Sequence, residues 1–293
     1  MEHKEQTNTY WERLENEAEQ YFLRGRLIKD MEEYMQQKPC RILEIGCGEG
    51  LLLNAMHKVN PNAECYGIEL SENAVKAGKE KYPQIHFINQ DLHAYFDSPE
   101  FERFDIVLSC NVMHELYTQV RREKGVEKAE DYVISLFAKL RECLTPGGLF
   151  VLVDGVLPDD ERDGTVSFIL TEHGKRIYDI IRDSYAFLRQ PLPEAAAGQV
   201  VTAPSIDFEK FITKSLFVET PDWEIERQES YQYFSRLRLE EIFRKLGFMI
   251  MREELQVEQW ELWQKLVKVV DGRFPFENIT LFCIAAGESE KGL

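Results

Sequence analysis

The feature that most constrains this chain is a glycine-rich turn after a short apolar run. The run Arg41–Ile45 predicts a β-strand, and from Gly46 to Gly50 glycine occupies every second position. Glycine lets the main chain turn tightly and approach a ligand closely, because it has no side chain. The residues from Gly50 to Val59 then predict a helix. A strand, a glycine turn and a helix in this order indicate a site for a nucleotide-like ligand.

The spacing of the glycines separates this turn from the dinucleotide-binding fingerprint. That fingerprint requires a third glycine three places after the second, at a position where this chain has Leu51. The spacing here is G-x-G-x-G. A glycine after a strand can also serve only the turn itself, and this alternative stays open at the level of sequence.

Strand and helix patterns alternate beyond the turn. Ser71 is a suitable helix N-cap, and a further helix is predicted over Glu127–Leu144. The additional strands are predicted at Cys65–Leu70, Ile85–Ile88, Phe104–Cys110 and Leu149–Val153. Strands separated by helices predict a parallel, doubly wound α/β sheet with right-handed crossovers.

The chain divides into three predicted regions: an N-terminal helical cap at 1–36, a core at 37–157 and 236–293, and an insertion at 158–235. Connections in compact domains are usually about 4 to 6 residues long. An insertion of this length therefore predicts a lid or a substrate-binding unit. Its predicted helices are Thr165–Leu188 and Asp207–Leu216. In the final part, strands at Phe248–Val257 and Asn278–Ala286 flank a helix at Gln259–Val270, after a helix at Arg238–Leu246.

Two acidic residues follow neighbouring predicted strands. Glu69 ends the second strand, where a carboxylate can accept both hydroxyls of a ribose. Asp91 follows the third strand, where it can accept the exocyclic amine of adenine. Without a ligand role, Glu69 would be a solvated residue at a strand end and Asp91 an ordinary loop aspartate.

These motifs resemble those of the class I S-adenosylmethionine-dependent methyltransferases, with Glu44–Gly50 similar to the family's first motif and Phe104–Asn111 similar to its fourth strand. The resemblance implies a Rossmann-like, mostly parallel sheet of seven strands that ends in an antiparallel hairpin, and S-adenosyl-L-methionine as cofactor. It implies that Glu44 and the backbone of Asn111 lie near the methionine amino group. The cofactor-binding residues implied in this way are Glu44, Gly46, Gly48, Gly50, Glu69, Leu70, Asp91, Leu92 and Asn111.

The sequence gives weaker indications of the residues that would contact the methyl acceptor. His114 lies just beyond the fourth strand, where a neutral imidazole could take a proton from a hydroxyl or ammonium acceptor. A packed or helix-capping histidine is the alternative. The candidate substrate-binding residues are aromatic, although aromatic residues at helical spacing more often belong to a core. They are Tyr10, Tyr21, Tyr117, Tyr231 and Tyr233.

Charge and cysteine usage narrow the class of protein. The net charge of −17, from 52 acidic and 35 basic residues, disfavours nucleic acid and anionic membranes as partners. No apolar run approaches the roughly 20 residues of a membrane span. The six scattered cysteines favour a reducing cytoplasm over a disulfide framework or a zinc cluster, and no Asp-rich cluster indicates another metal.

The sequence therefore predicts a cytoplasmic enzyme that passes a methyl group from S-adenosylmethionine to O, N or C of a small-molecule acceptor. An RNA or protein methyltransferase remains an alternative, as does a cofactor-binding partner subunit without catalysis. Neither the acceptor nor the oligomeric state is encoded in these motifs.

Overall fold

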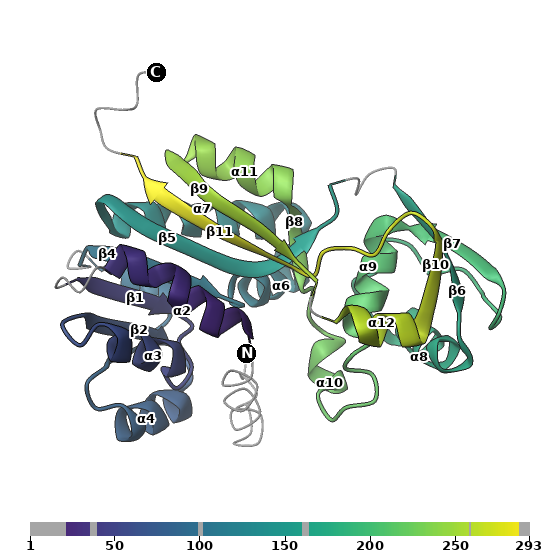
Figure 1. Cartoon of the computed structure of the whole chain (residues 1–293), viewed down its shortest axis with the longest axis horizontal. Coiled ribbons are helices and arrows are strands. Elements are labelled where there is room, and N and C mark those ends of the chain that lie inside the picture. The colour runs from purple at the N-terminus through teal and green to yellow at the C-terminus, as the bar shows by residue number, and fades with distance from the viewer. Residues whose placement is uncertain (1–21, 36–39, 99–101, 160–163, 258, 287–293) are drawn as a thin grey trace.

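The computed structural model describes residues 22–35, 40–98, 102–159, 164–257 and 259–286, which form two units side by side (Figure 1). The larger unit is a mostly parallel sheet covered by helices on both faces. The smaller unit is built around a three-stranded antiparallel sheet. Residues 1–21 of the predicted N-terminal helical cap, with Tyr10 and Tyr21, lie outside the described residues.

The central sheet has the strand order β3-β2-β1-β4-β5-β11-β9. Strand β11 runs antiparallel to both of its neighbours, β5 and β9, whereas β1 to β5 pair in parallel. The short strand β8 (Gln232–Ser235) pairs with the end of β5 and lies off this path. The mostly parallel seven-stranded sheet with a final antiparallel strand pair is thus confirmed. Its strands are β1 (Arg41–Ile45), β2 (Glu64–Glu69), β3 (His86–Asn89), β4 (Phe104–Cys110), β5 (Leu144–Leu157), β9 (Phe248–Gln256) and β11 (Asn278–Ala285).

Alternation along the strands divides the core between the two faces of the sheet. Ile42 packs with one cluster of buried side chains and its neighbour Leu43 with the other, because successive strand residues point to opposite faces. The first face is covered by α2 (Phe22–Met35), α3 (Leu51–Val59) and α4 (Glu72–Lys81), and the second by α5 (Leu92–Phe96), α6 (Met113–Lys124), α7 (Val126–Cys143) and α11 (Arg236–Lys245).

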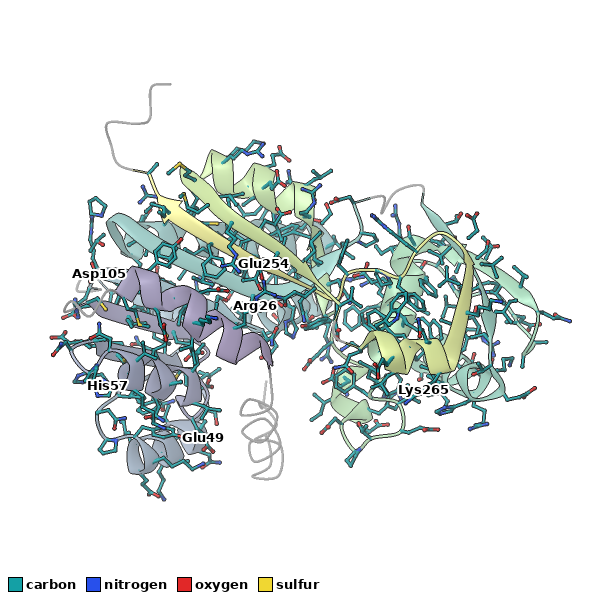
Figure 2. All side chains as sticks on the ribbon, in the orientation of Figure 1. Arg26, Glu49, His57, Asp105, Glu254 and Lys265 are labelled. Carbon is teal, nitrogen blue, oxygen red and sulfur yellow. The ribbon has the colours of Figure 1, made fainter. Side chains whose placement is uncertain are left out.

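Charged contacts place α2 along the sheet. Arg26 on α2 donates to Glu254 on β9 across 2.9 Å (Figure 2). Asp30, one turn later, accepts from Arg252 of the same strand across 2.9 Å. These contacts join the beginning of the described chain to a strand close to its end.

The smaller unit contains both strands and helices. Its sheet has the order β10-β6-β7, with antiparallel pairing throughout. Every residue of the central helix α9 is buried. The elements are β6 (Thr165–Leu170), α8 (Glu172–Ser184), β7 (Val200–Pro204), α9 (Ser205–Lys214), α10 (Trp223–Glu226), α12 (Trp260–Leu266) and β10 (Val267–Asp271).

Two details of the predicted organisation are wrong. The helix expected from Thr165 to Leu188 begins only at Glu172, because Thr171 caps it by accepting from Gly174 N across 3.0 Å. The residues before this cap form β6, so the insertion is not purely helical. The segment 260–271, which was assigned to the core, instead joins the smaller unit through the pairing of β10 with β6.

Within the described ranges, each helix is too short or too polar to cross a lipid bilayer.

Candidate functional site

The three glycines of the turn all adopt left-handed backbone conformations, with φ of 62° at Gly46, 54° at Gly48 and 84° at Gly50. A Cβ on Gly46 would lie 2.4 Å from Cγ2 of Val112, which follows β4. These φ values strain any residue with a Cβ. The bend therefore requires glycine, and it presents bare main chain at the carboxyl ends of β1 and β4.

Glu69 links the glycine turn to the end of the neighbouring strand. Its Oε2 accepts from Gly48 N across 3.0 Å, and its Oε1 accepts from Ser71 N across 2.8 Å. Each carboxylate oxygen has two acceptor positions, so Glu69 retains capacity for further donors. The strand tip and the turn thus lie together, as the predicted site requires.

Asp91 occupies the next strand end and caps a short helix. Its Oδ1 accepts from His93 N across 2.9 Å and from Ala94 N across 3.2 Å. Leu92 beside it is buried, whereas Leu70 at the tip of β2 is 47% exposed. The capping role is a second explanation for this aspartate. Glu44, in β1, is buried beneath the turn.

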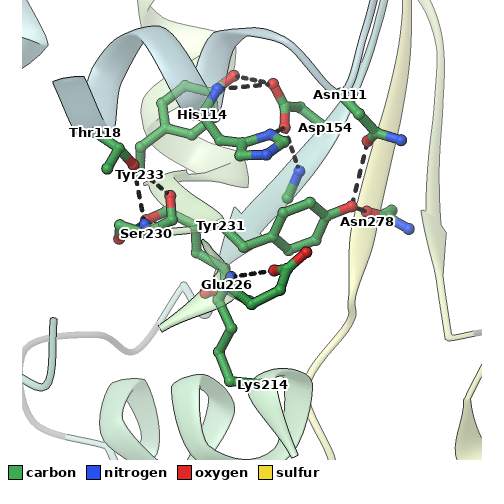
Figure 3. A network of polar contacts seen from close by, with 12 residues as sticks. Asn111, His114, Thr118, Asp154, Lys214, Glu226, Ser230, Tyr231, Tyr233 and Asn278 are labelled. Atoms are coloured by element: carbon green, nitrogen blue, oxygen red, sulfur yellow. Dashed lines mark hydrogen bonds and ion pairs between the residues drawn. The ribbon is translucent and has the colours of Figure 1, made fainter. Parts of the chain in front are cut away.

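Asn111 directly follows β4 and has a left-handed conformation with φ of 55°, and no other described non-glycine residue has a positive φ. Its backbone N donates to Val153 O across 2.8 Å. The hydroxyl of Tyr231 contacts the side-chain oxygen of Asn111 at 3.3 Å and that of Asn278 on β11 (Figure 3). Residues far apart in the sequence therefore meet above the end of β4.

His114 is buried in the first turn of α6 and is held by Asp154 near the end of β5. The ring Nδ1 lies 2.7 Å from Asp154 Oδ1, and the backbone N of His114 donates to Asp154 Oδ2 across 3.2 Å. Gly155 N and the hydroxyl of Tyr233 also donate to this carboxylate, across 2.9 and 3.3 Å (Figure 3). The fully buried carboxylate is thus surrounded by donors.

This contact decides the protonation of the histidine. Burial alone lowers the pKa of His114, but the charge and hydrogen bond of Asp154 outweigh it and raise the pKa to about 9. The ring is then protonated at neutral pH, and Nε2 carries a hydrogen. This argues against the neutral imidazole expected from the sequence and favours a donor role.

The structure separates the candidate tyrosines. Tyr231 is half-buried at the site, and its ring packs edge-on against His114 with 4.7 Å between centroids. Tyr117 and Tyr233 are core residues, each 3% exposed, so neither presents an open surface to a substrate. Tyr233 reaches the site only through its hydroxyl contact with Asp154.

Sequence reasoning missed Asp154 and Asn278. Asp154 had a recognisable signal, because an acidic residue follows the apolar run Leu149–Val153 at the carboxyl end of a strand, and Asp is rarely fully buried without partners. Asn278 had no such signal, because its position depends on β11 lying beside β5. Within the described residues, no group of three or more His, Cys, Asp or Glu side chains could hold a metal ion.

Comparison with known proteins identifies the domain that carries this site. A family model described as a methyltransferase domain matches residues 43–150, which include the glycine turn, Glu69, Asp91 and Asn111. Residues 43–150 of this chain are therefore a methyltransferase domain.

Individual curated relatives share only moderate sequence identity with this chain, over part of its length. Ubiquinone biosynthesis O-methyltransferase of Candida albicans is 30% identical over 99 residues, which cover 31% of this chain and 30% of the relative. Demethylmenaquinone methyltransferase of Staphylococcus carnosus is 29% identical over 140 residues, which cover 46% and 50%. The chain therefore spans half or less of the length of these curated relatives.

The similarity to solved structures extends over nearly the whole chain. The plantazolicin methyltransferase BpumL, in complex with a pentazolic desmethylPZN analog and SAH, covers 96% of this chain and 92% of its own, with a TM-score of 0.52 and 13% identity. At this identity the similarity concerns the fold, and it extends beyond the matched domain into the smaller unit.

Proposed function

We propose that this chain transfers the methyl group of S-adenosylmethionine to a small-molecule acceptor. The observation that carries the proposal is the contact of Glu69 with Gly48, which joins a bare glycine turn to a carboxylate at the next strand tip. A cofactor of this type has an amino-acid end that suits exposed backbone and a ribose whose hydroxyls suit a carboxylate. Its sulfonium supplies an already activated methyl group.

The residues of the turn would hold the methionine end, together with Glu44 and the backbone of Asn111. Glu69 would hold the ribose. Around the adenine we place Asp91, Leu92 and the exposed Leu70. A Cβ would clash with Val112 at Gly46 and with Phe87 at Gly50, so both positions of the turn require glycine.

For the acceptor side, we propose that His114 acts as a hydrogen-bond donor whose ring is fixed by Asp154. Alignment of the acceptor with the methyl carbon and exclusion of water are the main tasks of such a site. A protonated ring suits these tasks, because Nε2–H can orient a polar atom of the acceptor. Tyr231 would border the same position.

The net charge of −17 supports a small molecule over RNA as the acceptor, as do the small-molecule pathways named for the ubiquinone and menaquinone relatives. A cytoplasmic location is proposed because all six cysteines are free.

Calorimetry with S-adenosylhomocysteine tests the cofactor site. We expect the wild-type chain to bind and both Gly46→Val and Glu69→Ala to lose at least about tenfold in affinity, which corresponds to about 1.4 kcal/mol. Gly147→Val is the matched control, because Gly147 also has a positive φ of 78° but no atom lies within 4 Å of its Cβ position. Unchanged affinity in Gly46→Val, with the same circular dichroism spectrum as the wild type, would refute the site.

A further inference from the structure

One residue at the carboxyl end of β4 departs from ordinary backbone geometry. Asn111 has a φ of 55°, and it is exposed to solvent. A left-handed conformation is unfavourable for a residue with a side chain, although asparagine tolerates it better than most. Strained backbone of this kind persists only where the surrounding structure holds it, and it is concentrated at functional sites. The contacts that hold Asn111 are therefore informative about function.

Two contacts hold this residue. The backbone N of Asn111 donates to Val153 O on β5 across 2.8 Å. The hydroxyl of Tyr231 contacts the side-chain oxygen of Asn111 at 3.3 Å and donates to the side-chain oxygen of Asn278 as well (Figure 3). A hydroxyl has one hydrogen to donate, so the two amide oxygens share it. Asn278 is only 7% exposed, and an exposed residue after β4 is thus tied through one hydroxyl to a buried residue of β11.

The ring of Tyr231 is itself confined from several sides. It packs edge-on against His114 with 4.7 Å between the ring centroids. A Cβ on Gly155 of β5 would lie 2.4 Å from the backbone O of Tyr231 and 2.8 Å from Cδ1 of its ring. This strand therefore leaves no free space behind the tyrosine. Contacts from α6, β5 and β11 together fix the hydroxyl beside Asn111.

The corner that Asn111 forms leads directly to the glycine turn. The next residue is Val112, whose Cγ2 would lie 2.4 Å from a Cβ on Gly46. The backbone angles at Asn111 decide where Val112 lies, because φ and ψ are the only soft rotations of each residue. Released from its left-handed conformation, Asn111 would carry Val112 away from its present packing against Gly46. A continuous series of contacts thus runs from Asn278 through Tyr231 and Asn111 to the beginning of the turn.

We infer that Tyr231 and Asn278, on the acceptor side of this corner, are positioning residues for the methionine end of the cofactor and act through Asn111. The inference rests on the proposed function, in which the glycine turn and the backbone of Asn111 hold that end. The residues proposed for the ribose and adenine, Glu69 and Asp91, lie at the ends of β2 and β3, and β1 separates these strands from β4. The two positioning residues should therefore affect the methionine end alone.

Two ligands that share an adenosine separate this role from a general structural one. S-adenosylhomocysteine carries the amino-acid end, whereas 5′-methylthioadenosine lacks it. In Tyr231→Phe and in Asn278→Leu we expect the affinity for S-adenosylhomocysteine, measured by calorimetry, to fall about fivefold, as the loss of one hydrogen bond implies. The affinity for 5′-methylthioadenosine should stay within about twofold of the wild-type value. Tyr178→Phe is the matched control, because it removes a hydroxyl that donates to Pro193 O in the smaller unit across 2.8 Å, and it should change neither affinity.

The double variant Tyr231→Phe, Asn278→Leu tests whether the two residues act in one series of contacts. Both changes break the same tie to Asn111. The double variant should therefore lose about fivefold in affinity for S-adenosylhomocysteine, no more than either single variant. Two independent roles would instead multiply to a loss of about 25-fold.

Equal losses for the two ligands, an unchanged affinity for S-adenosylhomocysteine in the single variants, or losses that multiply in the double variant would each overturn the inference, while the cofactor site itself would stand. A loss in Tyr178→Phe as large as in Tyr231→Phe would also overturn it. If Asn278→Leu does not fold, as judged by circular dichroism, Tyr231→Phe alone decides between these outcomes. If the wild-type chain bound neither ligand, the proposed function would fail, and the inference with it.

Discussion

The contact between His114 and Asp154 predicts a pH dependence of stability that can be worked out from the structure. The pKa of His114 is raised from its ordinary 6.5 to about 9 in the folded protein, where Asp154, Glu115 and Glu229 face the ring. A tenfold change in proton affinity is worth about 1.4 kcal/mol, so the folded state gains up to about 3 kcal/mol from binding this proton. A raised histidine pKa contributes fully below pH 6.5, and the contribution declines as the pH rises through 9.

The measurement is urea unfolding of the wild type and Asp154→Asn at a series of pH values from 6 to 10. We expect the wild type to lose about 3 kcal/mol of unfolding free energy across this range relative to Asp154→Asn, because the variant no longer stabilises the charged ring. In Glu241→Gln, on the surface helix α11, the wild-type pH profile should be retained. Parallel profiles for wild type and Asp154→Asn would show that the histidine is not held as a charged partner.

Two further variants test the packing of α8 against the end of α12 and the separation of His114 from the cofactor site. A Cβ on Gly174 would lie 2.0 Å from the backbone O of Leu266. Gly174→Ala should therefore lower the free energy of unfolding by about 2 kcal/mol or more, measured by thermal unfolding. Gly198→Ala, where a Cβ has open space, should lower it by only about 1 kcal/mol because the backbone there is left-handed. A cost in Gly174→Ala no larger than in Gly198→Ala would contradict this packing. His114→Ala should bind S-adenosylhomocysteine within about threefold of wild type by calorimetry, because its contacts do not reach the glycine turn, and a large loss would place it in the cofactor site.

The sequence predicted the strands and the helix around the glycine turn well, because their signals are local. The strand at Phe104–Cys110 has the predicted bounds, and the strand and helix around the turn are placed within a residue. Glycine at Gly46 and Gly50 is a direct consequence of backbone conformations that other residues avoid. Such features depend on neighbours in sequence, so a single chain reveals them.

The smaller unit was harder to predict because its sheet depends on distant pairing. The run Thr165–Leu170 is compatible with a helix when it is considered alone. It becomes a central strand by pairing with β7 on one side and, on the other, with β10, about a hundred residues later in the chain. The cap at Thr171 was the one local signal for the boundary. Likewise, Val267–Asp271 continues an apolar pattern from α12, so the sequence predicted one longer helix.

The two halves of the site are therefore anchored differently. The chain passes between the larger and smaller units four times, after β5, before β8, after β9 and before β11. Residues proposed to lie on the acceptor side are next to three of these crossings: Asp154 in β5, Tyr231 before β8, and Asn278 at the beginning of β11. The glycine turn and Glu69 lie in a part of the sheet with no crossing. A shift of the smaller unit would consequently move the residues proposed to face the acceptor, while the glycine turn proposed to bind the cofactor stayed in place. On the proposed function, acceptor specificity is then the property most open to change in this fold.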